Sequence, residues 1–487
     1  MALPDLIEIV PLFEPVQAEI TVPGSKSITN RALILAALAD GQTKLRGALW
    51  SEDTQVMVEG LRTLGFEIGI EPDAEEFCNR TIVVRGLGGK IPVGGTDAKP
   101  LELFVGNAGT AARFLSAMVC LGNGVYRLHG IARMHERPQA ALFEALRDLG
   151  YEVESEKANE KLPVRIRGGG PGSEAHSRSS QSQSLLTSAA TNLGRRTCNV
   201  SIEESSQFAS ALMLCAETGG WEIKIDGHNP EESPYVTMTA ELIKAFPRNG
   251  GSFQIEPDAS SGSYFWAAAW LMVNRELEYF FSSAGKTSIP EEPRTFHYEG
   301  RPELSQVRVI NWPNTGWQID ADFTVFTQPL SLEPLKGATL PSEISRAHDL
   351  GDSIMTAIVL SPLVSQSVKF TELGRLRIQE SERVVGLRTE LTRCGAKVVE
   401  EGDTLTVHPS KLHGAEIETY NDHRMAMCFA VLALKVPGIK IKNPSCVKKT
   451  FPNFFQKLAA DPPHGLGAAI LDARTGRKLS AAELFAD

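Results

Sequence analysis

The sequence predicts an α/β protein that is built from one repeated unit of strands and helices. A short cluster of small, polar or glycine residues, followed by an Ala- and Leu-rich run, occurs six times, roughly every 80 residues. In addition, three segments share a pattern in which a helix ends at a glycine and an alternating strand follows: "LRTLGFEI", "LRDLGYEV" and "LTRCGAKV". Each unit is therefore expected to read strand, helix, strand, helix, strand.

The six apolar runs are expected to be buried helices. Runs such as "ALILAALA" and "YFWAAAWLMV" have no polar face, which is typical of core helices. The polar clusters that precede the six runs are Lys26-Ser27, Asn107 to Gly109, Ser205-Ser206, Ser260-Ser261, Asp352, and Asp422 to Arg424. Single serines or threonines at these positions (Ser27, Thr110, Ser206 and Ser261) are candidates for ordinary N-caps.

A chain of 487 residues is too long for one ordinary core, so the six units must be grouped. Two lobes of three units, with ligands between them, is the simplest division. We expect crossings between the lobes near "TVPGS" and in the turn-rich stretch 247–251. The Gly- and Ser-rich stretch 168–188 predicts a surface loop, and the strands of 286–347 cannot be assigned. The tail from Asp461 lies outside the repeat and is expected to be a surface appendage.

Composition excludes several classes of protein. The chain is 42% hydrophobic and 22% charged, as in soluble globular proteins, and its longest apolar runs are too short for a membrane span. A net charge of −10 without a basic block argues against a nucleic-acid partner. Seven scattered cysteines without a CxxC pair, and an N-terminus unlike a signal peptide, predict a cytoplasmic protein. No metal site is expected, because the ten histidines show no HxxxH or HExxH spacing.

The starts of the buried helices predict an anion site. A helix N-terminus presents free N–H groups and a partial positive charge. Lys26, Arg31, Arg113 and Arg424 lie near these starts in a protein that is acidic overall. If the helix starts converge on one cleft, that cleft suits phosphate and carboxylate groups. "GSKS" is not a P-loop, because the required glycine upstream is missing, and the glycine clusters lack the context of a dinucleotide fingerprint.

Two further charged clusters have an ordinary alternative. Glu136 and Arg137 in "HERPQ" precede a proline that opens a helix. The stretch "RLRIQESERVVGLRTEL" is dense in arginine and glutamate, which is also typical of a solvated helix face. Within it, Glu380 and Arg383 are three residues apart and can simply pair. His423 is equally well interpreted as a hydrogen-bonded core histidine.

Taken together, the motifs resemble those of the 5-enolpyruvylshikimate-3-phosphate (EPSP) synthases, which are enolpyruvyl transferases of the shikimate pathway. The matching series, in order from about residue 20 to 458, is "PGSKSITNRALILAAL", "GNAGTAARFL", "HERPQ", "ESSQFASALML", "DASSGSYF", "ESERVVGLRTEL", "NDHRMAM" and "KKTFPNFF". The resemblance implies a two-lobed fold of six βαβαββ units, of the inside-out α/β barrel type. One lobe would comprise 1–20 and 251–460, the other 21–250, followed by a tail at 461–487. It also implies a cytoplasmic monomer without cofactor or metal, and a glyphosate target.

The resemblance further implies a reaction and the residues that perform it. The enolpyruvyl group of phosphoenolpyruvate moves to the 5-hydroxyl of shikimate 3-phosphate, and phosphate leaves. The catalytic residues would be Asp352 as base, Glu380 as proton carrier, and Lys26. Shikimate 3-phosphate would be bound by Lys26, Ser27, Arg31, Ser205, Ser206, Gln207, Tyr235, Asp352, Arg375 and Gln379. Phosphoenolpyruvate would be bound by Lys26, Asn107, Gly109, Arg137, Gln207, Arg383, Arg424 and Lys449.

Four positions depart from the family pattern. Gln379 stands where the family has a lysine, and Arg375 where it has an asparagine, so Arg375 is a candidate to supply the missing charge. Glu232 replaces a serine, and Phe114 stands where proline is common, next to the expected phosphoenolpyruvate pocket.

Two alternatives stay open. One is an enzyme similar to UDP-N-acetylglucosamine enolpyruvyl transferase, which has Lys-Asn at the first motif and a reactive loop cysteine. The other is a homologue that binds shikimate phosphate without catalysis, for which Gln379 is the main support.

Overall fold

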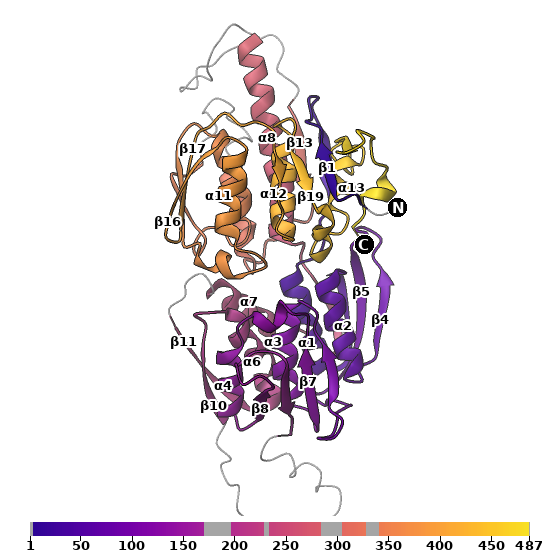
Figure 1. Ribbon diagram of the computed structural model, residues 1–487. Coiled ribbons are helices and arrows are strands. Elements are labelled where there is room, and N and C mark those ends of the chain that lie inside the picture. Colours follow the sequence, from indigo (N-terminus) through magenta and orange to yellow (C-terminus); the bar gives the residue numbers. More distant parts are fainter. Residues whose placement is uncertain (1–2, 170–195, 228–232, 284–303, 328–339, 487) are drawn as a thin grey trace, which may run out of the picture. The chain divides into compact units, whose positions relative to one another are not determined.

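The computed structural model describes residues 3–169, 196–227, 233–283, 304–327 and 340–486 (Figure 1). The chain divides into two compact units. Unit 1 comprises Met1–Ser25, Ala74–Cys78 and Glu256–Asp487, and unit 2 comprises Lys26–Asp73 and Asn79–Ile255. Glu232, nearly all of the predicted loop 168–188, and residues 284–303 and 328–339 of the unassigned stretch lie outside the described residues. Among the described residues, no helix is long and apolar enough to cross a membrane.

Unit 2 contains three sheets in its described residues. Their strand orders are β12-β3-β5-β4, β6-β7-β9-β8 and β10-β11. The strands are β3 (Asp40–Leu49), β4 (Ile68–Pro72), β5 (Asn79–Leu87), β6 (Leu101–Phe104), β7 (Val125–His129), β8 (Glu152–Ser155), β9 (Val164–Arg167), β10 (Arg196–Ser201), β11 (Trp221–Asp226) and β12 (Gly251–Gln254). The helices are α1 (Lys26–Leu38), α2 (Glu52–Thr63), α3 (Gly109–Val119), α4 (Ala140–Asp148), α6 (Ser206–Gly219) and α7 (Ser233–Ala245). Helices α1, α3 and α6 pack against one another and are buried on most sides.

Unit 1 also contains three sheets in its described residues. Their strand orders are β18-β19-β1-β20, β14-β15-β17-β16 and β13-β2. The strands are β1 (Leu6–Ile9), β2 (Gln17–Ile20), β13 (Gln306–Val309), β14 (Glu343–Ser345), β15 (Val368–Thr371), β16 (Lys397–Glu401), β17 (Thr404–His408), β18 (Glu416–Ile417), β19 (Lys440–Lys442) and β20 (Ile470–Asp472). The helices are α8 (Ala259–Ser283), α9 (Phe323–Thr327), α10 (Ile354–Leu360), α11 (Arg383–Arg393), α12 (His423–Ala433) and α13 (Phe454–Ala459). Here α8, α10 and α12 pack against one another, as their counterparts do in unit 2.

The predicted repeat and the α/β class are confirmed. Each of the six sheets holds one parallel pair of strands, and the chain segments β6-α3-β7-α4-β8-β9 and β14-α10-β15-α11-β16-β17 both read βαβαββ. All six predicted core helices form, and each starts within two residues of the polar cluster that precedes its apolar run. Gly65, Gly150 and Gly395 follow the ends of α2, α4 and α11 with φ of +94°, +86° and +92°, as the shared pattern requires.

The N-caps differ from the prediction. Ser27, Thr110, Ser206 and Ser261 all lie inside the first turn of their helices. At three helix starts the cap is the residue just before the helix. Ser205 Oγ accepts from the Gln207 N–H at 3.3 Å before α6, Asp258 Oδ1 from the Ser261 N–H at 2.7 Å before α8, and Asp422 Oδ1 from the Arg424 N–H at 2.9 Å before α12. Two of these caps are carboxylates, which also favour the positive end of a helix.

The C-terminal residues are not a surface appendage. Strand β20 pairs antiparallel with β1, and Leu479, Leu484 and Ala486 are buried. The sheet β18-β19-β1-β20 therefore takes strands from both ends of the chain. The repeat counted along the sequence does not include β20, because this strand pairs with β1, which lies far from it in the sequence.

The segment Ala74–Cys78 connects β4 to β5 of unit 2 but belongs to unit 1. Its Glu76 is buried, pairs with Lys457 at 2.8 Å and accepts from Asn453 Nδ2 at 2.8 Å. This interaction ties the segment to the start of α13.

Candidate active site

The start of α1 places a lysine beside a carboxylate. Lys26 is the first residue of the helix, and its Nζ lies 3.1 Å from Asp53 Oδ2, in the first turn of α2. Both side chains are largely buried. Asp53 was not predicted from the sequence, because one aspartate in the first turn of a helix is ordinary. It holds the ammonium group at the start of α1.

Arg31 is buried one turn further along α1. It donates through Nε to Thr239 Oγ1 at 2.7 Å and through Nη2 to Ser210 Oγ at 3.0 Å, which joins α1 to α7 and α6. Its guanidinium also lies 5.4 Å from the ring centre of Phe114 on α3. The departure at Phe114 therefore has a physical role, because the ring packs against an arginine that the sequence assigns to the site.

The remaining predicted residues near Arg31 are linked to it through α1, α6 and α7. The Ser27 carbonyl accepts from Arg31 Nη1 at 2.9 Å, and the Tyr235 carbonyl accepts from the Thr239 hydroxyl at 2.8 Å. Ser205 and Ser206 are buried at the start of α6.

The starts of α3 and α6 bring together a second group. Arg113 donates to Gln207 Oε1 at 2.6 Å, and Arg137 donates to the Asn107 carbonyl at 3.2 Å. A Cβ placed on Gly109 would lie 2.8 Å from the guanidinium of Arg137. Gly109 therefore leaves room for the side chain of Arg137. The motif alone suggests only that it leaves room for a ligand.

In unit 1, three arginines surround Asp352 before α10. Arg424 Nη2 lies 3.0 Å from Asp352 Oδ2, and Arg346 Nη2 lies 3.2 Å from Oδ1. Arg383 Nη1 is 3.8 Å from Oδ1. Burial by itself raises the pKa of Asp352, but Arg424, Arg383 and Arg346 together hold that pKa well below its usual range. Asp352 is therefore an ionised carboxylate at neutral pH.

Glu380 lies beside Asp352 in the same charge network. Its Oε1 is 3.0 Å from Lys449 Nζ, and its Oε2 accepts from Arg383 Nη2 at 2.8 Å. Arg383 is fully buried and also binds both oxygens of Asp422, at 2.7 and 3.2 Å. Arg383 thus joins the two carboxylates to the cap of α12.

The departure at residue 379 fits this network. Gln379 Oε1 accepts a hydrogen bond from Arg383 Nη1. A lysine has no acceptor and cannot make this contact. In place of the family's lysine, Gln379 thus provides a neutral acceptor beside the buried Arg383.

The dense charged stretch around Glu380 divides into two parts. Arg375 is buried in the 3-10 helix Gly374–Ile378, a few residues before Gln379 and Glu380 in the sequence. Arg377 instead pairs with Glu382, Glu400 and Asp403, at 2.7, 2.8 and 2.8 Å, and Arg388 pairs with Glu400 at 2.8 Å. The interpretation as a solvated face therefore holds for Arg377 and Arg388, whereas Glu380 and Arg383 belong to the buried network.

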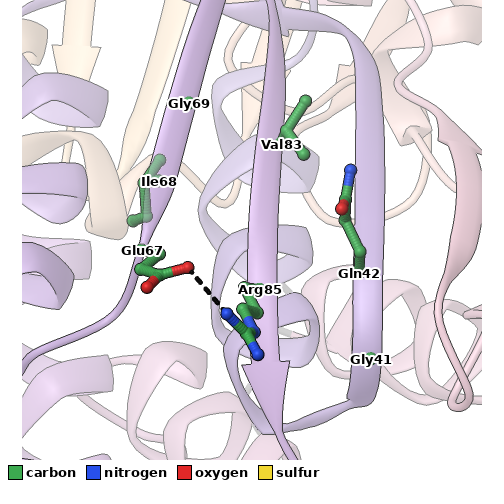
Figure 2. Close-up of a pocket in the computed structure, with 7 residues that line it drawn as sticks. All are labelled: Gly41, Gln42, Glu67, Ile68, Gly69, Val83 and Arg85. Carbon is green, nitrogen blue, oxygen red and sulfur yellow. Dashed lines mark hydrogen bonds and ion pairs between the residues drawn. The ribbon is translucent and has the colours of Figure 1, made fainter.

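A surface hollow lies over β3, β4 and β5 of unit 2 (Figure 2). It is lined by Gly41, Gln42, Glu67, Ile68, Gly69, Val83 and Arg85. Glu67 and Arg85 pair at 3.1 Å, and both side chains are mostly exposed, so water and salt screen the pair. None of the predicted site residues lines this hollow.

Comparison with known proteins supports the family resemblance. The family model described as EPSP synthase (3-phosphoshikimate 1-carboxyvinyltransferase) matches residues 12–277 and 322–458. The chain is 35% identical over 480 residues to a 3-phosphoshikimate 1-carboxyvinyltransferase of Nostoc sp., covering 93% of this chain and 98% of the relative. It is 36% identical over 472 residues to the protein of the same name from Opitutus terrae, covering 94% and 98%.

Solved structures agree at the level of the fold. The EPSP synthase from Acinetobacter baumannii matches with a TM-score of 0.65 at 19% identity, covering 96% of this chain and 99% of that one. The enolpyruvyl transferase NikO from Streptomyces tendae matches with a TM-score of 0.56 at 16% identity, covering 98% and 99%. The mixed α/β fold is thus shared with these enolpyruvyl transferases. The chain belongs to the family of EPSP synthases (3-phosphoshikimate 1-carboxyvinyltransferases).

Proposed function

We propose that the protein transfers the enolpyruvyl group of phosphoenolpyruvate to the 5-hydroxyl of shikimate 3-phosphate and releases phosphate. Membership of the family and the names of the relatives support this reaction. The observation that carries the proposal is the buried network of unit 1, in which Arg424 pairs with Asp352 and Lys449 pairs with Glu380, both at 3.0 Å. It combines two carboxylates for proton transfer with cations for anionic substrates.

In the proposed mechanism, the 5-hydroxyl oxygen attacks C2 of phosphoenolpyruvate while Asp352 accepts its proton and Glu380, assisted by Lys26, delivers a proton to C3. A tetrahedral ketal phosphate results. C3 then returns a proton to Glu380 as the C2–O bond to phosphate breaks, which forms the enol ether. The proton that Asp352 took from the 5-hydroxyl leaves with the phosphate, so both carboxylates return to their starting states. Each carboxylate thus handles one proton, and Glu380 acts first as acid and then as base.

The ion pairs in the network suggest how the substrate prepares the base. Arg424 and Lys449 are proposed to bind phosphoenolpyruvate, and in the structure they pair with Asp352 and Glu380. A bound phosphate and carboxylate compete for these cations. The hold of Arg424 on Asp352 then weakens, and the pKa of Asp352 rises from its lowered value towards that of a useful base.

The other predicted ligands complete two binding sets. For phosphoenolpyruvate the proposed set adds Arg383, Arg137, Asn107, Gly109, Gln207 and Lys26, and for shikimate 3-phosphate it is Lys26, Ser27, Arg31, Ser205, Ser206, Gln207, Tyr235, Asp352, Arg375 and Gln379. The resemblance implies two lobes, 1–20 with 251–460 and 21–250; the compact units change over five residues later, at Ser25/Lys26 and Ile255/Glu256. A cytoplasmic location and a monomeric state remain predictions.

The cysteines disfavour the alternative of a sister enzyme with a reactive loop cysteine. All seven are free and buried. Burial raises the pKa of Cys198 and Cys394 to about 11, which keeps both thiols protonated at neutral pH.

The function is tested by phosphate release from the purified protein with both substrates, and with each omitted in turn. We expect release that requires both, together with the enolpyruvyl product in the mass spectrum. Tight binding of shikimate 3-phosphate without release would support the non-catalytic alternative. Release with UDP-N-acetylglucosamine in place of shikimate 3-phosphate would support the sister activity.

Gly109→Ala is expected to raise the KM for phosphoenolpyruvate. The new methyl group would lie 2.8 Å from the Arg137 guanidinium, which must move away from the Asn107 carbonyl. Loss of one charge-assisted hydrogen bond corresponds to about a tenfold or larger increase in KM. Gly69→Ala is the control, because its Cβ would meet the nearest atom, of Val83, at an ordinary 3.7 Å. An unchanged KM in the Gly109 variant would show that Arg137 does not bind this substrate.

A further inference from the structure

We propose that Arg346 is a positioning residue that holds Oδ1 of Asp352, so that Oδ2 faces the substrate hydroxyl during catalysis. This inference rests on the proposed function. Arg346 was not singled out by any motif in the sequence, and it lies six residues before the proposed base.

The backbone fixes both ends of this contact. Arg346 follows the last residue of β14 directly, and its N–H donates to the Thr371 carbonyl at the end of β15, at 3.2 Å. Asp352 precedes α10, and the next residue along, Ser353, donates its N–H to Asp320 Oδ1 at 2.7 Å. The contact between the two side chains, 3.2 Å from Nη2 to Oδ1, is therefore held by a sheet on one side and a helix start on the other.

The three arginines around Asp352 differ in what else they can do. Arg424 retains 10% exposure of its side chain and faces Oδ2, so it can turn to a substrate anion. Arg383 is shared with Asp422 and Glu380 and lies further from Asp352, at 3.8 Å. Arg346 has a side chain only 1% exposed and belongs to neither proposed substrate-binding set. When Arg424 turns to phosphoenolpyruvate, Arg346 still holds Oδ1.

This division leaves one oxygen of the base available. Oδ1 is fixed by Arg346, whereas Oδ2 loses Arg424 and can accept the proton of the 5-hydroxyl. A guanidinium suits this task, because it stays charged at every working pH and cannot take the proton itself.

Energetics also favour orientation over stability as the role of Arg346. A buried ion pair contributes little net stability, because desolvation of both charges offsets their attraction. A misplaced reacting group, by contrast, lowers the rate strongly, with about a 10²-fold loss for an error near 1 Å. An arginine buried against the proposed base is therefore best explained by the geometry of that base.

The test is a double-mutant cycle on kcat with Arg346→Gln, Asp352→Asn and the combined variant. Arg346→Gln is expected to lower kcat by about 10²-fold, with the KM of both substrates within about twofold of the wild type. In the Asp352→Asn background, Arg346→Gln is expected to have no further effect, because Arg346 acts through Asp352. Arg346→Lys keeps the charge and should recover part of the loss.

The matched control is Arg393→Gln, which removes another arginine that is paired, at 2.8 Å, with a buried carboxylate of unit 1, Glu390. It should leave kcat unchanged. Two results would overturn the inference while leaving the proposed function intact. One is an equal loss of kcat from Arg346→Gln in the wild-type and the Asp352→Asn backgrounds. The other is a raised KM with unchanged kcat in the Arg346→Gln variant. Wild-type protein without turnover would instead overturn the proposed function, and the inference with it. Thermal unfolding of each variant establishes that it is folded.

Discussion

Asp352→Asn is expected to lower kcat by about 10²–10⁴-fold, the range lost when a general base is removed. The amide keeps the shape of the side chain and can still accept a hydrogen bond from Arg346 through its single oxygen. Its NH2 group cannot accept from Arg424, and it cannot take the proton of the 5-hydroxyl. Both substrates should therefore still bind. Phosphate release measures the rate, and calorimetric titration with shikimate 3-phosphate measures the binding.

Asp403→Asn serves as the control for this substitution. Asp403 is a mostly exposed carboxylate of unit 1 that pairs with Arg377 at 2.8 Å, and its loss should leave kcat unchanged. A wild-type rate in the Asp352 variant would remove Asp352 from the mechanism and leave Glu380 as the sole proton carrier of the network.

The lowered pKa of Asp352 also predicts how activity depends on pH. A carboxylate whose pKa is held below its usual value stays ionised until the pH falls through that lowered value. The contribution of ionised Asp352 in the free enzyme is thus present at neutral pH and is lost only below the usual pKa range of an aspartate. A fall of kcat/KM near pH 5 in the wild type, if observed, would have to come from another group, and it should persist in the Asp352→Asn variant.

Asp422→Ala is expected to have the largest effect on stability, about 3–5 kcal/mol in the free energy of unfolding. Asp422 is fully buried, binds Arg383 through both oxygens and caps α12. Its removal leaves Arg383 buried with less compensation for its charge, and it also removes the cap. Chemical denaturation monitored by circular dichroism gives the change.

Asp422→Asn separates the two contributions. Asparagine caps a helix about as well as aspartate, so this variant keeps the cap and loses mainly the charge. It should be destabilised, but less than the alanine variant. Equal stability of the alanine variant and the wild type would show that Arg383 does not depend on Asp422.

The features that the sequence predicts well are those that local pattern determines. The six apolar helices and the strands after Gly65, Gly150 and Gly395 follow from periodicity and from glycine at positive φ. The final strand of the βαβαββ unit is predicted only by the family resemblance. The family motifs predict residues that the structure brings together within each unit, such as Asp352 with Arg424 and Glu380 with Lys449.

The features that the sequence does not predict depend on partners distant in the chain. Asp53 and Arg346 belong to no motif, and their roles become visible only when Lys26 and Asp352 are seen beside them. The strand β20 has no partner nearby in sequence, because it pairs with β1. The caps differ by one to three residues, since serine and aspartate at neighbouring positions compete for the same N–H groups.

The place of β1 between β19 and β20 has a consequence for the order in which the protein folds during synthesis. Unit 2 is complete once the ribosome has released Ile255. Ile7 and Ile9 of β1 are fully buried, yet both neighbours of that strand, together with the Asn453 and Lys457 that hold Glu76, are made near the end of the chain. Strand β1 therefore precedes unit 2 in the chain but can pair only after unit 2 has been synthesised, when β19 and β20 are available.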